Sequence, residues 1–347
     1  MATERKKRSK TSSFTLLELV VSMAVLMLLM ALLLTATDMA SKTWRSTTEK
    51  MRAFENARAG FDLINSTLSQ AVLQTYWDYD DPAHPTKYEL SSELQFLSLP
   101  MNQMLQSGGS LPEANFPTHG LFFQAPTGAV LNQASYGGLP LLLNAYGYYV
   151  EYSDDSAEIP NFLKSLPGFK PRYRYRLKQW KVPAESIALY QNTSGVGGKN
   201  YVGYPTSLSW IDLANPAATA IAENVVALVI HPINPQSAGG AATELTADFV
   251  YNSRNNYTIA PAVYQHNQLP PEVEVIMVAI DEASAVRIFN NSPTSPGLAV
   301  GLFTDPTKID GNNGDLKKLT DDLTQRRLNF IVMRSTVKIR GAGWIQD

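Results

Sequence analysis

The sequence contains no cysteine among its 347 residues and only four histidines. The absence of cysteine excludes disulfides, thiolate nucleophiles and thiolate metal sites. The histidines are isolated, without a pair at metal-ligand spacing, and no Gly-x-Ser-x-Gly elbow occurs. The glycine-rich run 195–198 has Thr193 and Asn200 where a phosphate loop needs a glycine and a hydroxyl. We therefore expect no enzyme and no cofactor.

Glycine and proline, the residues that most weaken a helix, are also absent between Phe14 and Ala59. In the second half of this region and just beyond it, apolar residues recur at spacings close to three, four and seven, which is the period of an amphipathic helix. They are Trp44, Met51, Phe54, Phe61, Ile64, Leu68 and Val72. This pattern predicts one helix over residues 14–74, with its apolar stripe packed against a folded domain.

The first half of the predicted helix is apolar all round, and residues 19–34 form an almost uninterrupted apolar run. The 21 residues from 14 to 34 would span about 30 Å as a helix, the thickness of a hydrocarbon core. Residues 1–13 carry five bases and one acid, so they should stay cytoplasmic while the following chain crosses. We expect a single-pass protein of the inner membrane, with its C-terminal domain on the extracytoplasmic side.

Glu18 is the one acid in the apolar stretch. A charge at the bilayer centre costs about 2.5 to 3.5 kcal/mol or more, so this carboxylate should lie near the interface or have a buried partner. If the chain is cut between Ser13 and Phe14, the new α-amino group of a neighbouring copy could be that partner. A secretory signal peptide has a shorter apolar core. A plain signal anchor remains an alternative, but it does not account for Glu18.

This combination resembles the type IV prepilin signature, in which a short basic leader precedes a Phe, a Glu at the fifth mature position and an apolar helix. The resemblance implies that a prepilin peptidase cleaves after Ser13, where the family normally has Gly, and methylates Phe14. It assigns Glu18 to filament assembly. The implied partners are other pilins or pseudopilins, the peptidase and an inner-membrane assembly platform.

Segments beyond the leader resemble minor pilins and the minor pseudopilin J group of type II secretion; they are 148–150, 175–177, 221–225 and 269–275. Others, at 54–58, 68–79 and 279–285, are similar to the pilin-like Verru_Chthon cassette protein C family. These resemblances imply a minor subunit of a type IV pilus or of a type II secretion-like filament. The alternative is a membrane-tethered envelope-binding protein that does not assemble.

The remainder of the chain is rich in Gly, Pro, Asn, Ser and Tyr, with short β-like runs. The predicted strands are 93–99, 121–124, 146–152, 172–180, 225–231, 273–280 and 329–340, with helices at 282–290 and 316–329. Four long polar segments, 102–118, 191–205, 234–245 and 291–314, should be surface insertions. The predicted fold is α+β, divided into a leader (1–13), the transmembrane half of the helix (14–38), its amphipathic half (39–75) and a β-rich domain (76–347).

Residues 310–315 combine three oxygen-bearing side chains, Asp310, Asn312 and Asp315, with a tight glycine turn. Calcium loops use such ligands, but the glutamate that closes an EF-hand loop is missing. A plain turn stabilised by Asp and Asn side chains explains the same pattern. The sequence favours the turn and leaves calcium as an alternative.

A basic alternation occupies residues 170–178 and would place Arg172, Arg174, Arg176 and Lys178 on one face of a strand. A nucleic-acid strip, a partner-protein contact and a solvated face all fit this pattern. Without the leader, however, 24 Lys and Arg stand against 30 Asp and Glu, a net charge of about −6 that opposes nucleic-acid binding. We therefore expect a solvated face and no nucleic acid.

Overall fold

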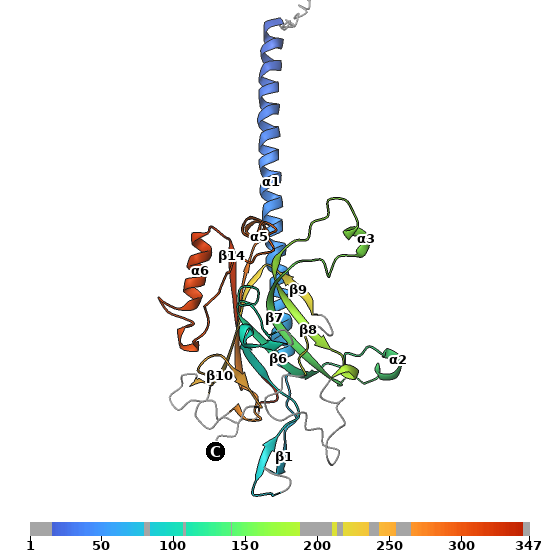
Figure 1. Ribbon diagram of the computed structural model, residues 1–347. Coiled ribbons are helices and arrows are strands. Elements are labelled where there is room, and N and C mark those ends of the chain that lie inside the picture. Colours follow the sequence, from blue (N-terminus) through green and yellow to red (C-terminus); the bar gives the residue numbers. More distant parts are fainter. Residues whose placement is uncertain are drawn as a thin grey trace, which may run out of the picture. The chain divides into compact units, whose positions relative to one another are not determined.

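The computed structural model describes residues 16–79, 84–106, 109–139, 141–187, 210–213, 218–235, 243–254 and 265–342. It divides into a first unit, residues 1–51, and a second unit, residues 52–347. Figure 1 shows a long N-terminal helix and a β-rich second unit with a few short helices. The predicted α+β class is confirmed.

Helix α1 runs from Leu16 to Leu68, so residues 52–68 belong to the second unit. Within its apolar part, hydroxyl groups donate back to carbonyl oxygens of the preceding turn, as Thr35 does to Leu32 at 2.8 Å. The prediction that the helix continues to residue 74 is wrong. The Val72 N–H instead donates to the Gln124 carbonyl oxygen at 3.0 Å, and Gln74 has a left-handed φ of 49°.

One sheet of the second unit has six antiparallel strands. Their order is β12 (Tyr251–Asn252), β3 (Leu97–Pro100), β6 (His119–Pro126), β7 (Leu143–Ser153), β8 (Arg174–Val182) and β9 (Thr219–Glu223). The longest pairing joins β7 and β8, from Ala145 opposite Val182 to Ser153 opposite Arg174. Aromatic side chains fill much of its buried surface, including Phe122, Phe123, Tyr148 and Trp180.

The second sheet has four strands in the order β11 (Thr243–Glu244), β10 (Val225–Asn234), β13 (Glu272–Ile280) and β14 (Phe330–Lys338). Helix α5 (Glu282–Phe289) follows β13 directly, and the Asp281 carboxylate caps it by accepting from the Ser284 N–H at 2.8 Å. Helix α6 (Asp315–Gln325) precedes β14 and buries Leu319 and Leu323. Both predicted small helices are present, and α6 ends four residues before its predicted limit.

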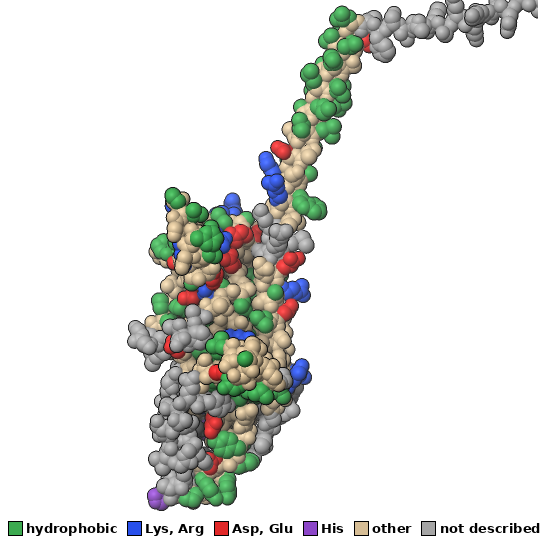
Figure 2. All heavy atoms as spheres, turned by 90° about the vertical axis from the view of Figure 1, so that its right-hand side faces the viewer, with side chains coloured by type: hydrophobic (Ala, Val, Ile, Leu, Met, Phe, Trp, Pro, Cys, Tyr) green, Lys and Arg blue, Asp and Glu red, His purple; other side chains and the backbone are tan. Residues whose placement is uncertain are grey.

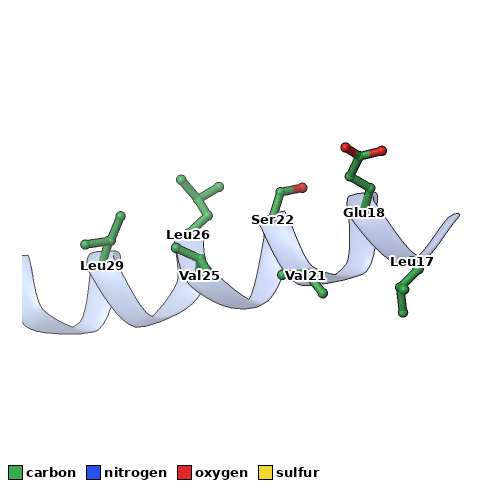
Figure 3. Close-up of a pocket in the computed structure, with 7 residues that line it drawn as sticks. All are labelled: Leu17, Glu18, Val21, Ser22, Val25, Leu26 and Leu29. Carbon is green, nitrogen blue, oxygen red and sulfur yellow. The ribbon is translucent and has the colours of Figure 1, made fainter. Parts of the chain in front are cut away.

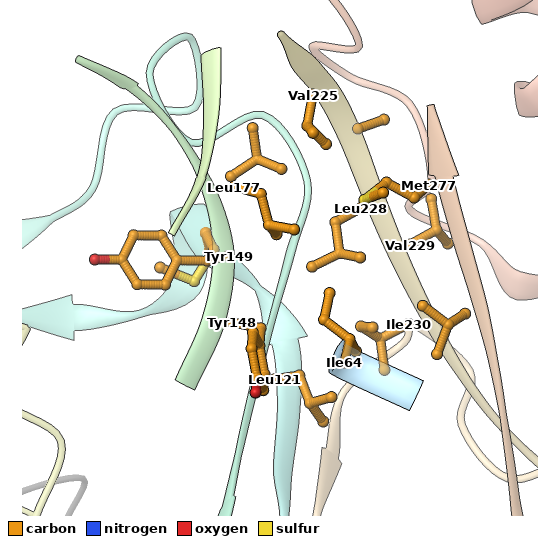
Figure 4. Close-up of a cluster of buried hydrophobic side chains, with 14 of the residues drawn as sticks. Ile64, Leu121, Tyr148, Tyr149, Leu177, Val225, Leu228, Val229, Ile230 and Met277 are labelled. Carbon is orange, nitrogen blue, oxygen red and sulfur yellow. The ribbon is translucent and has the colours of Figure 1, made fainter. Parts of the chain in front are cut away.

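The core of the second unit lies where the two sheets and the C-terminal part of α1 meet. Figure 4 shows Ile64 of α1 among side chains of both sheets, with Leu121 and Tyr148 on one side and Leu228 and Ile230 on the other. Gly60 permits this close approach, because a Cβ there would lie 3.1 Å from Leu177 and 3.3 Å from Ala222. The predicted apolar stripe is thus confirmed from Phe61 to Leu68, all of whose stripe positions are buried.

All seven predicted strands occur, with ends that differ by a few residues. Patterning did not reveal the shorter elements, which are β1 (Tyr76–Tyr79), β2 (Tyr88–Ser91), β4 (Leu105–Gln106), β5 (Gly109–Ser110), β9, β11, β12, α2 (Gln133–Tyr136), α3 (Asn161–Lys164) and the 3-10 turns 101–103, 184–186 and 306–308. The segment 291–314 is no simple surface insertion, because Leu298, Phe303 and Ile309 are buried. Segment 191–205 lies outside the described residues.

Candidate functional site

The N-terminal part of α1 presents apolar side chains on all its faces. The larger apolar side chains between Leu16 and Leu34 are 51 to 83% exposed. By length and composition, Leu16–Thr48 can cross a membrane, and none of its most apolar window is buried within the structure. A helix that is hydrophobic all round needs an apolar environment, which lipid or neighbouring helices provide. Single-pass anchoring in the inner membrane is consistent with this segment.

Glu18 lies in the first turn of the described helix. The positive end of the helix dipole is located there and favours a carboxylate. Figure 3 shows Glu18, Ser22 and Leu26 projecting to one side of the helix, whereas Leu17 and Val21 project to the other. The Ser22 hydroxyl donates to the Leu19 carbonyl oxygen at 2.9 Å, so its hydrogen is used within the helix. Glu18 is therefore the one formally charged side chain on the helix surface between Leu16 and Leu34.

The two predicted processing residues, Ser13 and Phe14, lie outside the described residues. Their assignment rests on the sequence. In the sequence, Phe14 stands four positions before Glu18, a little more than one helical turn. A carboxylate one turn from a new N-terminus can bind an ammonium group brought by a neighbouring chain.

The prediction of a solvated face at residues 172–178 is wrong for three of its four cations, whereas Arg172 is 48% exposed. Arg174, Arg176 and Lys178 of β8 have side chains that are only 3, 0 and 7% exposed. Four acids neutralise this basic strand and its flank: Asp155 with Arg172 at 2.9 Å, Glu282 with Arg174 at 3.3 Å, Glu223 with Arg176 at 3.5 Å and Glu158 with Lys178 at 3.1 Å. Arg174, Arg176 and Lys178 are therefore buried within an ion-pair network, whose acids Glu282, Glu223 and Glu158 are 35 to 37% exposed.

Two neighbouring acids show how this network affects ionisation. Burial raises the pKa of Glu151, next to Tyr152 on β7, although Lys178 and Arg176 counteract that effect. Burial also opposes ionisation of Asp155, but hydrogen bonds from the Arg172 backbone and guanidinium lower its pKa overall. Charge on β8 therefore serves the packing of the second unit.

The candidate calcium residues have separate protein partners. Asp310 accepts two hydrogen bonds from the Arg334 guanidinium, at 2.9 and 2.8 Å. Asp315 accepts from the Phe303 N–H at 2.9 Å and from the Lys318 ammonium at 2.8 Å. Asn312 lies in the exposed turn that follows Gly311, whose φ is +103°. Among the described residues no group of three His, Cys, Asp or Glu side chains could hold a metal ion.

Sequence reasoning missed the buried His119, which connects three parts of the second unit. Its Nδ1 accepts from the Ile230 N–H at 3.1 Å, so its Nε2 donates to the Phe303 carbonyl oxygen at 2.9 Å. Burial lowers its pKa to about 4, so the ring is neutral at pH 7. Because both partners are backbone groups far away in the chain, no local pattern marks this histidine.

Comparison with known proteins bears on the N-terminal segment. Residues 8–34 match the model of the prokaryotic N-terminal methylation motif. The matched stretch contains Ser13, Phe14, Glu18 and the apolar run up to Leu34. No curated protein and no solved structure matches the chain.

Proposed function

We propose that the chain is a pilin-like minor subunit, processed by a prepilin peptidase and assembled into a type IV pilus or a type II secretion-like filament. The peptidase cleaves between Ser13 and Phe14 and methylates the new N-terminus. The mature chain is held in the inner membrane by the apolar part of α1 until it is recruited. The second unit is then displayed on the extracytoplasmic side.

The observation that carries this proposal is Glu18 on an apolar, exposed helix inside a methylation-motif match. A carboxylate in lipid is costly, and a membrane tether has no use for it. In a packed bundle of such helices, an unpaired carboxylate or amine costs several kcal/mol, so arrangements that pair the two are selected. The amine of one Phe14 and the carboxylate of a neighbour's Glu18 form such a pair.

Mass spectrometry of the N-terminus, on protein from membranes of cells with an active prepilin peptidase, tests the proposal. The expected mature chain begins with N-methyl-Phe14. Replacing Ser13 by Gly should not reduce cleavage. An intact leader, or a start near Thr37, would instead favour an uncleaved tether or a secreted protein.

A further inference from the structure

We propose that the loop joining β7 to β8, residues 154–173, rests on the anionic lipid surface of the membrane in which the chain is anchored. The loop contains the short helix α3. This inference goes beyond the proposed function and requires only that α1 anchors the chain in the membrane.

The tip of the loop exposes large apolar side chains among basic ones. Phe162, Leu163 and Leu166 are 70, 37 and 56% exposed. Residues 160–170 also contain Lys164 and Lys170 and no acid. Apolar side chains that insert between headgroups, together with lysines that meet anionic phosphates, are the usual means by which a segment lies on a membrane.

Of the three acids at the base of the loop, Asp155 and Glu158 are paired with cations, whereas Asp154 accepts a hydrogen bond from the Ser156 N–H at 2.8 Å. Asp155 accepts from the backbone N–H and the guanidinium of Arg172, at 2.8 and 2.9 Å. Glu158 pairs with the buried Lys178. The Asp155–Arg172 pair also joins the two ends of the loop, so that the segment between them projects from the sheet.

The direction of α1 within the second unit shows which end of the sheet carries this loop. A Cβ on Gly60 would meet Leu177, which is paired with Val150 of β7, while the Val72 N–H bonds to Gln124, which is paired with Ala145. The C-terminal part of α1 therefore runs in the direction opposite to β7, so that earlier residues of α1 lie near later residues of β7. Residues 52–56 lie toward Ser153, at the end where the loop begins, and Figure 1 shows α3 at that end and the β1–β2 hairpin at the opposite end.

The chain length between membrane and loop permits the contact. Asp38 is the first charged residue after the apolar run, and residues 38–52 span about 21 Å if helical. The loop that begins after Ser153 lies at the end of the sheet from which residues 52–56 lead toward this linking helix. We infer from this length of chain that the tip can reach the headgroup layer.

A second apolar loop provides a matched comparison. Residues 127–142 join β6 to β7 at the opposite end of β7 and expose Leu131, Leu139 and Leu141, at 76, 51 and 76%. That loop contains no charged residue. Figure 2 faces the side of the second unit on which both loops lie, with hydrophobic side chains at its upper end and again below. Apolar exposure alone therefore does not distinguish the two loops, whereas position and charge do.

The test uses the full chain reconstituted in vesicles. Because the protein has no native cysteine, Ser165→Cys at the C-terminal cap of α3 and Ser135→Cys in α2 each give a unique position for an environment-sensitive fluorophore. We expect spin-labelled lipids to quench the label at 165 more than the label at 135 in vesicles of phosphatidylethanolamine and phosphatidylglycerol. Lys164→Gln and Lys170→Gln should each weaken the contact about fivefold on these vesicles and little on phosphatidylcholine.

In the Ser165→Cys background, Phe162→Ser with Leu166→Ser should abolish the quenching, while Leu131→Ser with Leu141→Ser should leave it unchanged. Equal quenching at positions 165 and 135 would overturn the inference. So would a label at 165 that is shielded from water but not quenched by lipid, which would point to a protein neighbour. Release of the chain by alkaline extraction would show that α1 does not anchor it, and would overturn both the inference and the proposed function.

Discussion

Two stretches of helix α1 differ in how their apolar side chains are exposed. Between Leu16 and Leu34 the apolar side chains cover every face and are all exposed. From Ala57 to Leu68, by contrast, one stripe is buried and the remaining faces carry mostly polar residues. The first stretch has no preferred side, so it requires an apolar surrounding such as lipid or a bundle of like helices. The second stretch has one apolar side, which the two sheets cover. Amphipathicity, and not helix propensity, separates the membrane part of α1 from its domain part.

Removal of each stretch should show the difference most strongly. A chain lacking residues 1–43 should be soluble and folded, because the buried stripe remains. A chain lacking residues 1–74 should lose its cooperative melt, since both sheets would expose the surface that covers Phe61, Ile64 and Leu68. Thermal melts followed by circular dichroism check this, and equal melting temperatures would show that the stripe does not hold the sheets together.

Single truncations of similar side chains should repeat the contrast at smaller scale. Ile64 is fully buried, and Ile64→Ala should lower the free energy of unfolding of the second unit by about 2 to 5 kcal/mol. Leu26 is 58% exposed in the first unit, and Leu26→Ala should leave that free energy unchanged. Denaturant unfolding of the second unit in the full chain, in detergent, measures both. A loss of stability in Leu26→Ala would mean that the two stretches are coupled.

The pH dependence of stability should come from the second unit. His119 has a folded pKa of about 4, below its ordinary value of 6.5, so the folded state resists the protonation that the unfolded state accepts. Its contribution is complete above pH 6.5 and is lost as the pH falls toward 4, which amounts to about 2 kcal/mol between pH 7 and pH 5. Burial opposes ionisation of Glu274, but His231 and Arg334 hold its pKa at about 2. This carboxylate therefore adds a loss of stability only as the pH falls below its ordinary pKa of 4.5.

Denaturant melts at several pH values of the chain lacking residues 1–43 measure this dependence. His119→Gln keeps a donor for Phe303 but has no imidazole to titrate, so its stability should change less between pH 7 and pH 5. If the free energy of unfolding changed equally with pH in both proteins, the pH dependence would come from groups other than His119.

The smallest effect on stability, and the most specific effect on function, is expected at Glu18. Glu18→Gln should leave insertion, cleavage and the melt of the second unit unchanged, because no part of that unit depends on the residue. Under the proposed function it should nevertheless abolish recruitment, since the proposed acceptor for a neighbour's amine loses its charge. Crosslinking to partner pilins in membranes measures recruitment, and Ser22→Ala, one turn further on the same side, is the matched control. Crosslinking of Glu18→Gln at the unaltered level would favour the simple tether.

Local sequence determined the features that contiguous residues encode. The basic leader, the apolar run, Glu18 and the helical period are each visible within a few turns of chain, and so are the long strands and α5. The length of α1 was predicted less well, because its end depends on Val72 bonding to β6, far away in sequence. The short hairpin β1–β2 and the edge strands β11 and β12 carry too few residues for a period to be read.

Only the tertiary structure decided which polar groups are buried. The alternation at 172–178 correctly predicted a strand, but it wrongly predicted that the basic side chains are solvated. The acids that bind Arg174 and Arg176 lie on α5 and β9, up to 108 residues away in the sequence. The same holds for His119, whose ring bonds to backbone groups of Ile230 and Phe303, and for the segment 291–314, which covers the core with Leu298 and Phe303. A buried charge or imidazole is tolerated only when its partners are in place. Those partners are brought together by the fold of the whole second unit, which no local pattern records.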